Sequence, residues 1–365
     1  MLIVLRERVT AHDVEHVVAI VRDAGMGAHV RQHGQRTVVL ATGEGAERAA
    51  TAAAALGEHG CVETVRPIGR PYTLACRDAQ PASTRVELDD GTAIGGGGVV
   101  VIAGPCCVED DATLIETARA AAAAGAHLLK TSTFHADPYG FQGAGPAALR
   151  WLVEARAMTG LPVISDVRMA AEVGPVSEVV DAILIGSGDM QHYDLLREAG
   201  RQPKPVVLKR GRGSTIEEWL LAAEYVLAQG NERVILCEPG VRGFDPTTDG
   251  ILDVAAIPAL RELTHLPVLA DPSQATGRAG LVAPTARAAI AAGADGVLID
   301  VHPRPAEARA GARRSLGFRE LAELMPALAR VAQSTGRAMA ARPSARRAGR
   351  AHAAAASLSP ALAVE

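Results

Sequence analysis

Lysine and aromatic residues are scarce in this chain. Of its 37 basic residues only three are lysine, Lys130, Lys204 and Lys209, and aromatic side chains make up 3 % of the 365 residues. Five cysteines, two of them adjacent, are too few for a disulfide scaffold and predict a reduced, cytoplasmic protein. No run reaches the roughly 18 apolar residues of a membrane span, and the first residues lack the pattern of a secretory signal.

The overall composition excludes other classes of protein. A formal net charge of −4 and an apolar fraction of 48 % argue against a nucleic-acid binder and against a disordered chain. A chain of this length buries a large core, as one large domain alone or with a smaller one. Because arginine replaces lysine almost everywhere, the positions that keep lysine are candidates for roles that require an amine.

The first 66 residues predict a small separate domain. Val14, Val17, Val18 and Val21 have helical spacing, and short strand patterns lie on both sides of them. The expected order β-α-β-β-α-β is that of a ferredoxin-like α+β domain. No acid–base cluster lies in residues 1–66, so we predict a regulatory or assembly domain there.

A repeated pattern begins after a linker predicted over residues 67–98. Eight near-continuous apolar strands, each ending in polar residues, are expected over 99–104, 127–132, 162–167, 182–187, 205–211, 233–240, 267–273 and 296–303. Eight βα units in about 200 residues predict an α/β fold, a (β/α)8 TIM barrel over 99–335. The Ala- and Arg-rich segment 336–365 is predicted to be a disordered tail.

The active site of such a barrel lies at the C-terminal ends of its strands. The polar residues expected there are Cys106, Lys130, His135, Asp166, Asp189, Gln191, Lys209, Arg210, Cys237, Glu238, Asp271, Gln274, Asp300 and His302. Two of the three lysines are among them. A buried lysine serves as a reactive amine, as a cation for phosphate or carboxylate, or as one half of a structural ion pair. The cysteine, aspartates and histidines would also suit a metal, although their spacing is not local.

Specific segments carry a family resemblance from Met1 to about residue 333. They are RTVVLAT (36–42), CVETVRP (61–67), RPYTLACR (70–77), IAGPC (102–106), FQG (141–143), PVVLKRG (205–211), TIEEWLLAAEYVLAQGN (215–231), VILCE (234–238), LPVLADPS (266–273), the prolines and histidine of 302–305, and SLGF (315–318). The chain resembles the 3-deoxy-D-arabino-heptulosonate 7-phosphate (DAHP) synthases that carry an N-terminal ferredoxin-like domain. It resembles more distantly the 3-deoxy-octulosonate 8-phosphate synthases.

The resemblance implies an activity and, in most members, a metal. Such enzymes join phosphoenolpyruvate to a sugar-phosphate aldehyde with loss of phosphate, and most hold a divalent metal with Cys, His, Glu and Asp. Cys106 matches the cysteine, but Gln274 replaces the histidine, Asp300 the glutamate and Gly311 the aspartate. Cys106, Asp300 and Gln274 therefore make an incomplete metal site. We predict weak binding of a transition metal, because an amide is a poor ligand.

The resemblance also implies altered phosphate binding. Residues 134–137 replace a Lys-Pro-Arg loop, and arginines of the family are missing from 186–189 and 237–240. Because arginine grips phosphate through two parallel hydrogen bonds, these losses disfavour a substrate pair with two phosphates. The cations retained at matching positions are Lys130, Lys209, Arg210 and Arg242.

These observations give a predicted set of site residues. The catalytic candidates are Lys130, Lys209, His135 and Asp166, and the substrate-binding candidates are Arg210, Arg242, Gln191, Glu238, Asp271, His302 and Tyr139. Lys209 would hold a carboxylate or a phosphate, and Lys130 would act as an electrophile or a Schiff-base amine. His135 or Asp166 would move protons.

Three functions fit the sequence. The favoured hypothesis is a repurposed aldolase-type enzyme that joins or cleaves a C–C bond between a pyruvate-like donor and an aldehyde. The second is a DAHP synthase, the first enzyme of the shikimate pathway, using erythrose 4-phosphate. The third is a non-catalytic regulatory relative. The substrate is a small molecule in the first two, and the resemblance implies a homo-oligomer, a tetramer or a dimer.

Overall fold

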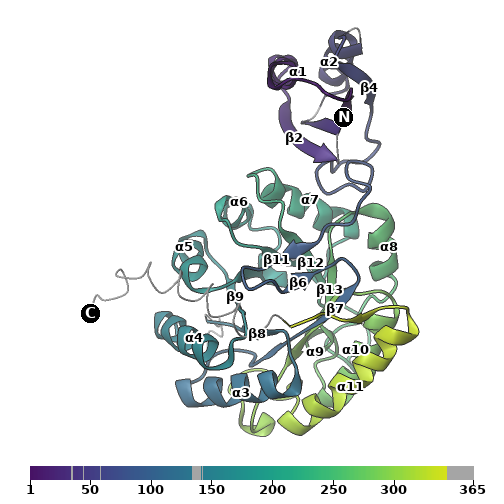
Figure 1. The fold of residues 1–365 in the computed structure, drawn as a ribbon. Helices are drawn as coiled ribbons and strands as arrows, with labels where there is room; N and C mark the ends of the chain where they lie inside the picture. The colour runs from purple at the N-terminus through teal and green to yellow at the C-terminus, as the bar shows by residue number, and fades with distance from the viewer. Residues whose placement is uncertain (34–35, 44, 58, 134–140, 142, 343–365) are drawn as a thin grey trace. The chain divides into compact units, whose positions relative to one another are not determined.

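The computed structural model describes residues 1–33, 36–43, 45–57, 59–133, 141 and 143–342 (Figure 1). These residues form two compact units. One contains residues 1–82 and 262–265, and the other contains 83–261 and the described residues from 266 onward. Within the described part of the chain, every helix is too short or too polar to cross a membrane.

The first unit contains a four-stranded antiparallel sheet and two helices. Its elements are β1 (Leu2–Leu5), α1 (Ala11–Asp23), β2 (Gly27–His33), β3 (Arg36–Thr42), α2 (Ala46–Gly57) and β4 (Val62–Arg66). The strand order β2-β3-β1-β4 and the two crossover helices confirm the predicted ferredoxin-like domain. Val17 and Val21 of α1 pack on Ile3 and Val39 of the sheet, so the helical spacing of the valines fixes which face is buried.

The second unit is the predicted barrel. Its parallel strands are β7 (Gly98–Gly104), β8 (Leu128–Thr131), β9 (Val163–Val167), β10 (Ala182–Ile185), β11 (Val206–Lys209), β12 (Val234–Glu238), β13 (Val268–Ala270) and β14 (Gly296–Asp300). Each pairs with the next in sequence, and β14 pairs with β7 to close the ring. All eight expected strands are confirmed, because each is a short apolar run buried on both faces.

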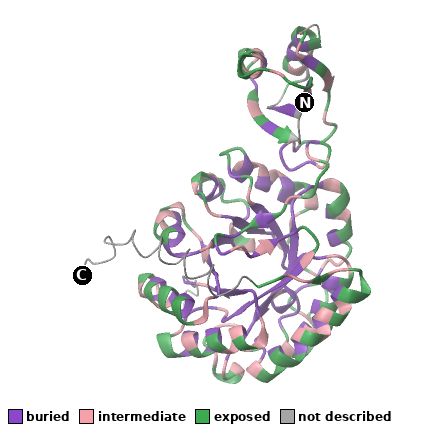
Figure 2. Cartoon of the chain, in the orientation of Figure 1, coloured by how far each residue is buried: buried purple, intermediate pink, exposed green. Residues whose placement is uncertain are grey.

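Helices surround the strands and shield them from solvent (Figure 2). They are α3 (Asp111–Ala124), α4 (Pro146–Thr159), α5 (Ala170–Val179), α6 (Tyr193–Arg201), α7 (Ile216–Leu227), α8 (Ala256–Leu263), the short α9 (Pro272–Thr276), α10 (Ala279–Ala291) and α11 (Phe318–Ser334). Local sequence sets where they start: the Asp110 carboxylate caps α3, and Thr215 and Glu218 form a capping box on α7.

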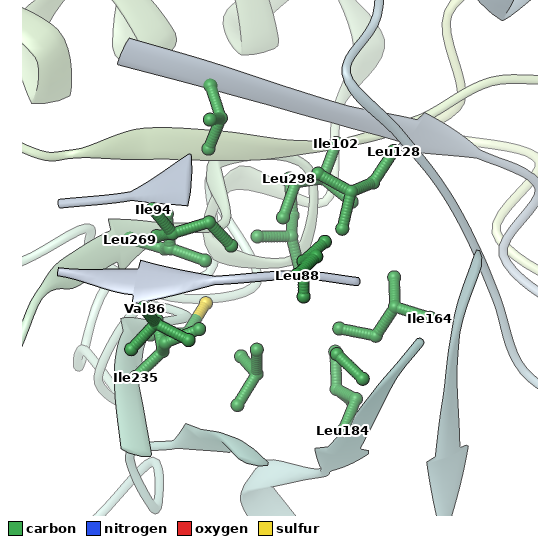
Figure 3. Packing of buried hydrophobic residues seen from close by; sticks show 14 residues of the cluster. Val86, Leu88, Ile94, Ile102, Leu128, Ile164, Leu184, Ile235, Leu269 and Leu298 are labelled. Atoms are coloured by element: carbon green, nitrogen blue, oxygen red, sulfur yellow. The ribbon is translucent and has the colours of Figure 1, made fainter. Parts of the chain in front are cut away.

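A two-stranded sheet packs against the inside of the barrel. The strands β5 (Val86–Glu87) and β6 (Ala93–Ile94) pair antiparallel, and Val86, Leu88 and Ile94 join a cluster of buried residues from the barrel strands. Figure 3 shows these side chains directed toward Ile235, Leu269 and their neighbours. The barrel interior is therefore a packed hydrophobic core.

Two segments differ from the sequence-based expectation. The predicted linker 67–98 is divided between the two units, and its second half contains the β5–β6 sheet, because Val86 and Ile94 supply apolar cover for the barrel. The first residues of the predicted disordered tail are ordered, because β15 (Ala338–Met339) pairs with β7. Arg337 donates a 2.8 Å hydrogen bond to the carbonyl of Ala294 and supports this strand. Residues 343–365 lie outside the described part of the chain.

Candidate active site

Charged side chains gather where the barrel strands end. Lys209, Glu238 and Asp300 are the last residues of β11, β12 and β14, Lys130 lies one residue before the end of β8, and Asp271 follows β13. All five are at least 90 % buried. Because every barrel strand is parallel, these ends share one mouth, where barrel enzymes place their chemistry.

A glycine brings two of these strands close together. Gly104 ends β7, and a Cβ atom at this position would overlap the backbone oxygen of Lys130. Only glycine allows this approach, which places the following Cys106 beside the end of β8. The register pairs Asp300 of β14 with Gly104 on the other side, so Asp300 also lies next to this turn.

The first group of contacts, the Asp300 cluster, consists of Asp300, Lys130, Arg314 and Cys106. The Lys130 ammonium donates to Oδ1 of Asp300, while Nε of Arg314 donates to Oδ2 over 2.6 Å. Nη2 of the same Arg314 lies 3.0 Å from Sγ of Cys106. One carboxylate is thus held between two cations, and one of these cations reaches the thiol.

Electrostatics keep the central groups of this cluster charged. Desolvation alone would raise the pKa of Asp300, but the charges of Lys130 and Arg314 outweigh it and hold that pKa well below its ordinary value. Desolvation would lower the pKa of Lys130, and the Asp300 charge reverses this so that the pKa is raised. Burial raises the pKa of the Cys106 thiol. The cluster therefore carries a net positive charge at neutral pH.

The second group, the Lys209 cluster, joins Lys209, Asp271, Gln274 and Ser187. The Lys209 ammonium donates to Oδ2 of Asp271 over 2.6 Å and to Oε1 of Gln274 over 2.8 Å. The other oxygen of Asp271 caps α9 by accepting from the Gln274 backbone at 2.8 Å. The Gln274 amide donates onward to the Ser187 hydroxyl over 3.3 Å. Gln274 is thus oriented by its neighbours to present an acceptor to an ammonium.

The third group, the Arg210 cluster, joins Arg210 to two carboxylates. Nη1 of Arg210 lies 3.0 Å from Glu238 and 3.0 Å from Asp253. The Gly240 amide donates to Glu238 over 2.8 Å. Burial raises the pKa of Glu238 although the Arg210 charge opposes this. The guanidinium is thus already engaged by protein groups, which leaves it less able to bind a phosphate.

Asp166 has a buried carboxylate oxygen that accepts no hydrogen bond from the described residues. The Ser132 hydroxyl donates to its Oδ2 over 2.7 Å, while its buried Oδ1 accepts no hydrogen bond from the described residues. Desolvation raises the pKa of Asp166 to about 6, against the opposing effect of Ser132 and Lys209. An acid with this pKa gains and loses protons near neutral pH.

Comparisons with known proteins agree with this architecture. The family model described as the DAHP synthetase I family matches residues 82–336. The model described as the DAHP synthase ferredoxin-like domain matches residues 1–70. The chain belongs to the DAHP synthetase I family. Its members are enzymes, so the expected class of aldolase or transferase is confirmed.

One relative covers almost the whole chain, and another covers about half of it. A phospho-2-dehydro-3-deoxyheptonate aldolase of Thermotoga maritima is 38 % identical over 338 residues, which is 92 % of this chain and 99 % of that protein. A crystal structure of a phospho-2-dehydro-3-deoxyheptonate aldolase (DAHP synthase) from Thermotoga maritima superposes with a TM-score of 0.73 at 37 % identity, and the match covers 93 % of this chain and 98 % of that one. A 2-dehydro-3-deoxyphosphooctonate aldolase of Syntrophotalea carbinolica is 32 % identical over 48 % of this chain and 67 % of that protein.

The other predicted site residues of this chain lie apart from the Asp300, Lys209 and Arg210 clusters. His302 is buried, and its Nε2 lies 3.7 Å from Glu109. Gln191 and Arg242 are exposed, and in the described part of the chain their side chains make no hydrogen bond to the clusters. His135 and Tyr139 fall outside the described residues, so their roles stay predictions.

Sequence reasoning missed Arg314 and Asp253. Both contact predicted residues, Arg314 through Asp300 and Cys106 and Asp253 through Arg210. Arg314 gave little signal, because it is one of 34 arginines and lies well beyond the last barrel strand. The one available clue was its place three residues after Gly311, in the loop that the family resemblance assigns to a metal ligand.

The residues present do not fit the divalent metal that the family resemblance implies. The Arg314 guanidinium lies between Cys106 and Asp300, and Gln274 offers its amide oxygen to Lys209. Gly311 has no donor, and its φ of 72° places it in the left-handed region that favours glycine. Among the described residues, no group of three or more His, Cys, Asp or Glu side chains is arranged to hold a metal ion.

Proposed function

We propose that this chain is a DAHP synthase, which condenses phosphoenolpyruvate with erythrose 4-phosphate and releases phosphate. The match to the Thermotoga maritima DAHP synthase over 92 % of this chain carries the proposal, because it includes both domains. This was the second of the three sequence-based hypotheses, and it has better support than a repurposed enzyme. C3 of phosphoenolpyruvate bonds to the aldehyde carbon. One water supplies the ketone oxygen at C2 and gives its protons to the aldehyde oxygen and the departing phosphate.

The buried cations have the chemistry to bind the anionic donor. Phosphoenolpyruvate carries a carboxylate and a phosphate, and each accepts charge-assisted hydrogen bonds from an ammonium or a guanidinium. Lys209 is tied to Asp271 and Gln274 by two of its three N–H groups, which leaves one for a ligand. Lys130 is tied to Asp300 and likewise retains donors. We assign Lys209 to the donor anion and Lys130 to the aldehyde oxygen, where it stabilises developing negative charge.

Asp166 is the assigned proton carrier. Its unused Oδ1 and its pKa of about 6 allow it to hold a proton in a fraction of the molecules near neutral pH. The Ser132 hydroxyl on Oδ2 fixes the orientation of the carboxyl group. We place Asp166 as the donor of the proton that the aldehyde oxygen gains when the C–C bond forms. One proton of the water that adds at C2 then returns Asp166 to its acid form, so the proton from water reaches the aldehyde oxygen by way of this carboxyl group.

One observation favours a second candidate, an aldehyde acceptor without a terminal phosphate. The Arg210 guanidinium faces Glu238 and Asp253, and the segment 186–189 contributes the carboxylate of Asp189. Burial raises the pKa of Asp189, with Arg168 at 3.9 Å opposing it. Each charge-assisted contact to a phosphate contributes about 1.5–3 kcal/mol, so their absence weakens a phosphorylated acceptor most.

The test compares acceptors with and without phosphate. Purified protein is incubated with phosphoenolpyruvate and either erythrose 4-phosphate or D-erythrose, and both phosphate release and the 3-deoxy-keto acid product are measured. Turnover with erythrose 4-phosphate supports the DAHP synthase, and a higher kcat/KM with D-erythrose supports the second candidate. Release of phosphate with neither acceptor, in a folded protein, would contradict both.

Two matched lysine variants test, in the same assay, whether Lys209 belongs to the active site. Lys209→Met is expected to abolish turnover because it removes the assigned contact with the donor anion, whereas the partly exposed Lys204 is 3.6 Å from Asp89 and has no assigned role. Lys204→Met should therefore retain the activity. A homo-oligomer, a dimer or a tetramer, belongs to this proposal, and sedimentation velocity measures it.

A further inference from the structure

We propose that the guanidinium of Arg314 takes the place of a divalent cation at this barrel mouth, so that the enzyme works without a bound metal. This inference rests on the proposed condensation only for its kinetic readout. Arg314 connects the two residues that the family resemblance assigns as metal ligands here, Cys106 and Asp300. Its Nε reaches Oδ2 of Asp300 at 2.6 Å, and its Nη2 reaches Sγ of Cys106 at 3.0 Å.

The Arg314 guanidinium contacts Cys106 and Asp300 together, as a bound cation would. A guanidinium presents N–H donors in a rigid fork, so one side chain contacts two acceptors, Cys106 and Asp300, that are 194 positions apart in the chain (300 − 106). Cys106 comes from the turn after β7, and Asp300 ends β14, the strand paired with β7. Arg314 is also fixed locally, because its backbone amide donates to the Gly311 carbonyl over 3.0 Å. The loop thus holds the cation in position before any substrate arrives.

The charges already present also oppose the binding of a metal ion alongside Arg314. Asp300 already balances the Lys130 ammonium on Oδ1 and the Arg314 guanidinium on Oδ2. A divalent ion on the same carboxylate would face two positive charges within a few ångström, in a site where repulsion is weakly screened. The metal and the guanidinium are therefore alternatives.

Gly311 explains why the loop can accommodate arginine. A Cβ atom at Gly311 would lie 2.8 Å from Cβ of Cys106 and 3.1 Å from its Sγ. The loop therefore passes so close to Cys106 that a side chain at 311 would need the thiol to move. Glycine at this position, with its φ of 72°, keeps Cys106 in reach of Arg314.

The first experiment measures metal binding without turnover. The purified full-length chain is treated with EDTA, and Mn²⁺ is then titrated by electron paramagnetic resonance and by calorimetry. We expect no stoichiometric site, and an unchanged melting temperature with and without Mn²⁺. Binding of one Mn²⁺ per chain that is lost in Asp300→Asn would overturn the proposal, whether or not the protein makes DAHP.

The second experiment removes the guanidinium. We expect Arg314→Gln to lower kcat/KM by about tenfold to a hundredfold, the effect of losing charge-assisted contacts. Added guanidinium ion should partly restore turnover, a rescue that a purely structural role would not give. The matched control is Arg319→Gln, because Arg319 is exposed on α11 and pairs with Glu323.

The third experiment follows turnover during chelation. Wild-type activity should be the same in EDTA and in Mn²⁺, and a loss in EDTA that Mn²⁺ reverses would overturn the inference. Unchanged kcat/KM in a folded Arg314→Gln would also overturn it. If that variant does not fold, the wild-type titration still decides. If no aldehyde is turned over, the proposed condensation fails and the metal titration stands independently.

Discussion

The two lysines at the barrel mouth are each held by a buried aspartate. Lys209 contacts Asp271 at 2.6 Å, and Lys130 contacts Asp300. Burying an ion pair costs desolvation energy that the mutual attraction only roughly offsets. Such pairs are therefore poor sources of stability, but they hold an ammonium in one orientation, which a binding site requires.

Removing one partner of a buried ion pair should reveal the desolvation cost of the charge that remains. We expect Lys209→Met to lower the free energy of unfolding by about 3–5 kcal/mol, because it leaves the Asp271 carboxylate buried without its cation. Lys204→Met is the control, since Lys204 pairs with the exposed Asp89 and should cost less than about 1 kcal/mol. Urea denaturation followed by circular dichroism measures both, and equal losses would show that burial of the pair has no special effect.

Asp166 predicts a pH dependence of the rate. Its pKa is raised from 3.8 to about 6 by burial, so its protonated fraction falls as the pH increases through 6. As the proton donor it should give kcat/KM a descending limb with a midpoint near pH 6. Asp166→Asn should slow the reaction and remove this limb. A variant that keeps the wild-type profile would show that another group carries the proton.

At the scale of elements, the barrel needs a cover that its own strands do not provide. The β5–β6 sheet supplies it, with Val86, Leu88 and Ile94 packed against the barrel interior (Figure 3). A segment as short as this has no independent stability and depends on packing against a larger core. The sheet and the barrel should therefore unfold together.

Truncating one side chain of this cover tests that dependence. Leu88 is 3 % exposed, so Leu88→Ala should leave a cavity and lower the free energy of unfolding by about 2–5 kcal/mol. Met158→Ala is the matched control, because Met158 is 51 % exposed and its loss should cost less than about 1 kcal/mol. Chemical denaturation gives both values. A loss in Leu88→Ala as small as in the control would contradict the assigned role.

At the scale of the whole chain, the end of the described sequence is tied to the first barrel strand. β15 pairs with β7, and His127 connects the two regions through both ring nitrogens. The Val101 amide donates to Nδ1 over 3.0 Å, and Nε2 lies 2.9 Å from the Ala340 carbonyl. This arrangement requires neutral imidazole, because a proton on Nδ1 would face the Val101 N–H group.

The link through His127 should make stability depend on pH. Burial lowers the pKa of His127 below 6.5, so the unfolded chain takes up the proton first as the pH falls. The stabilisation is complete above about pH 6.5 and is lost as the pH drops below it. His127→Gln keeps a donor and an acceptor and should reduce this slope.

A comparison of the wild-type protein with His127→Gln isolates the contribution of His127 to the pH dependence of stability. Asp166 contributes the opposite slope between its ordinary pKa of 3.8 and about 6, because the folded chain holds its proton more tightly. The difference between wild type and His127→Gln cancels that contribution. Urea midpoints from about pH 5 to about pH 8 measure it, and parallel curves would contradict the prediction.

Much of the candidate site was accessible from the sequence. Lys130, Lys209 and Asp300 were placed at strand ends because apolar runs end in polar residues there, and all three lie at the mouth. The partners of these residues were not accessible. The ion pair between Lys130 and Asp300 spans 170 positions, and no local pattern encodes which charged residues meet across a barrel.

The sequence by itself determined the elements: eight apolar strands, the helices between them and the front βαββαβ domain follow from periodicity and capping, which act within a few residues. Only the tertiary structure decided the role of Arg314. It lies 208 positions from Cys106, and closure of β14 onto β7 brings the two together. The scarcity of lysine pointed to Lys130 and Lys209, and both lie at the ends of barrel strands. Arg314 is a further cation there, hidden in the sequence by the abundance of arginine and identified by the carboxylate and the thiol that it contacts.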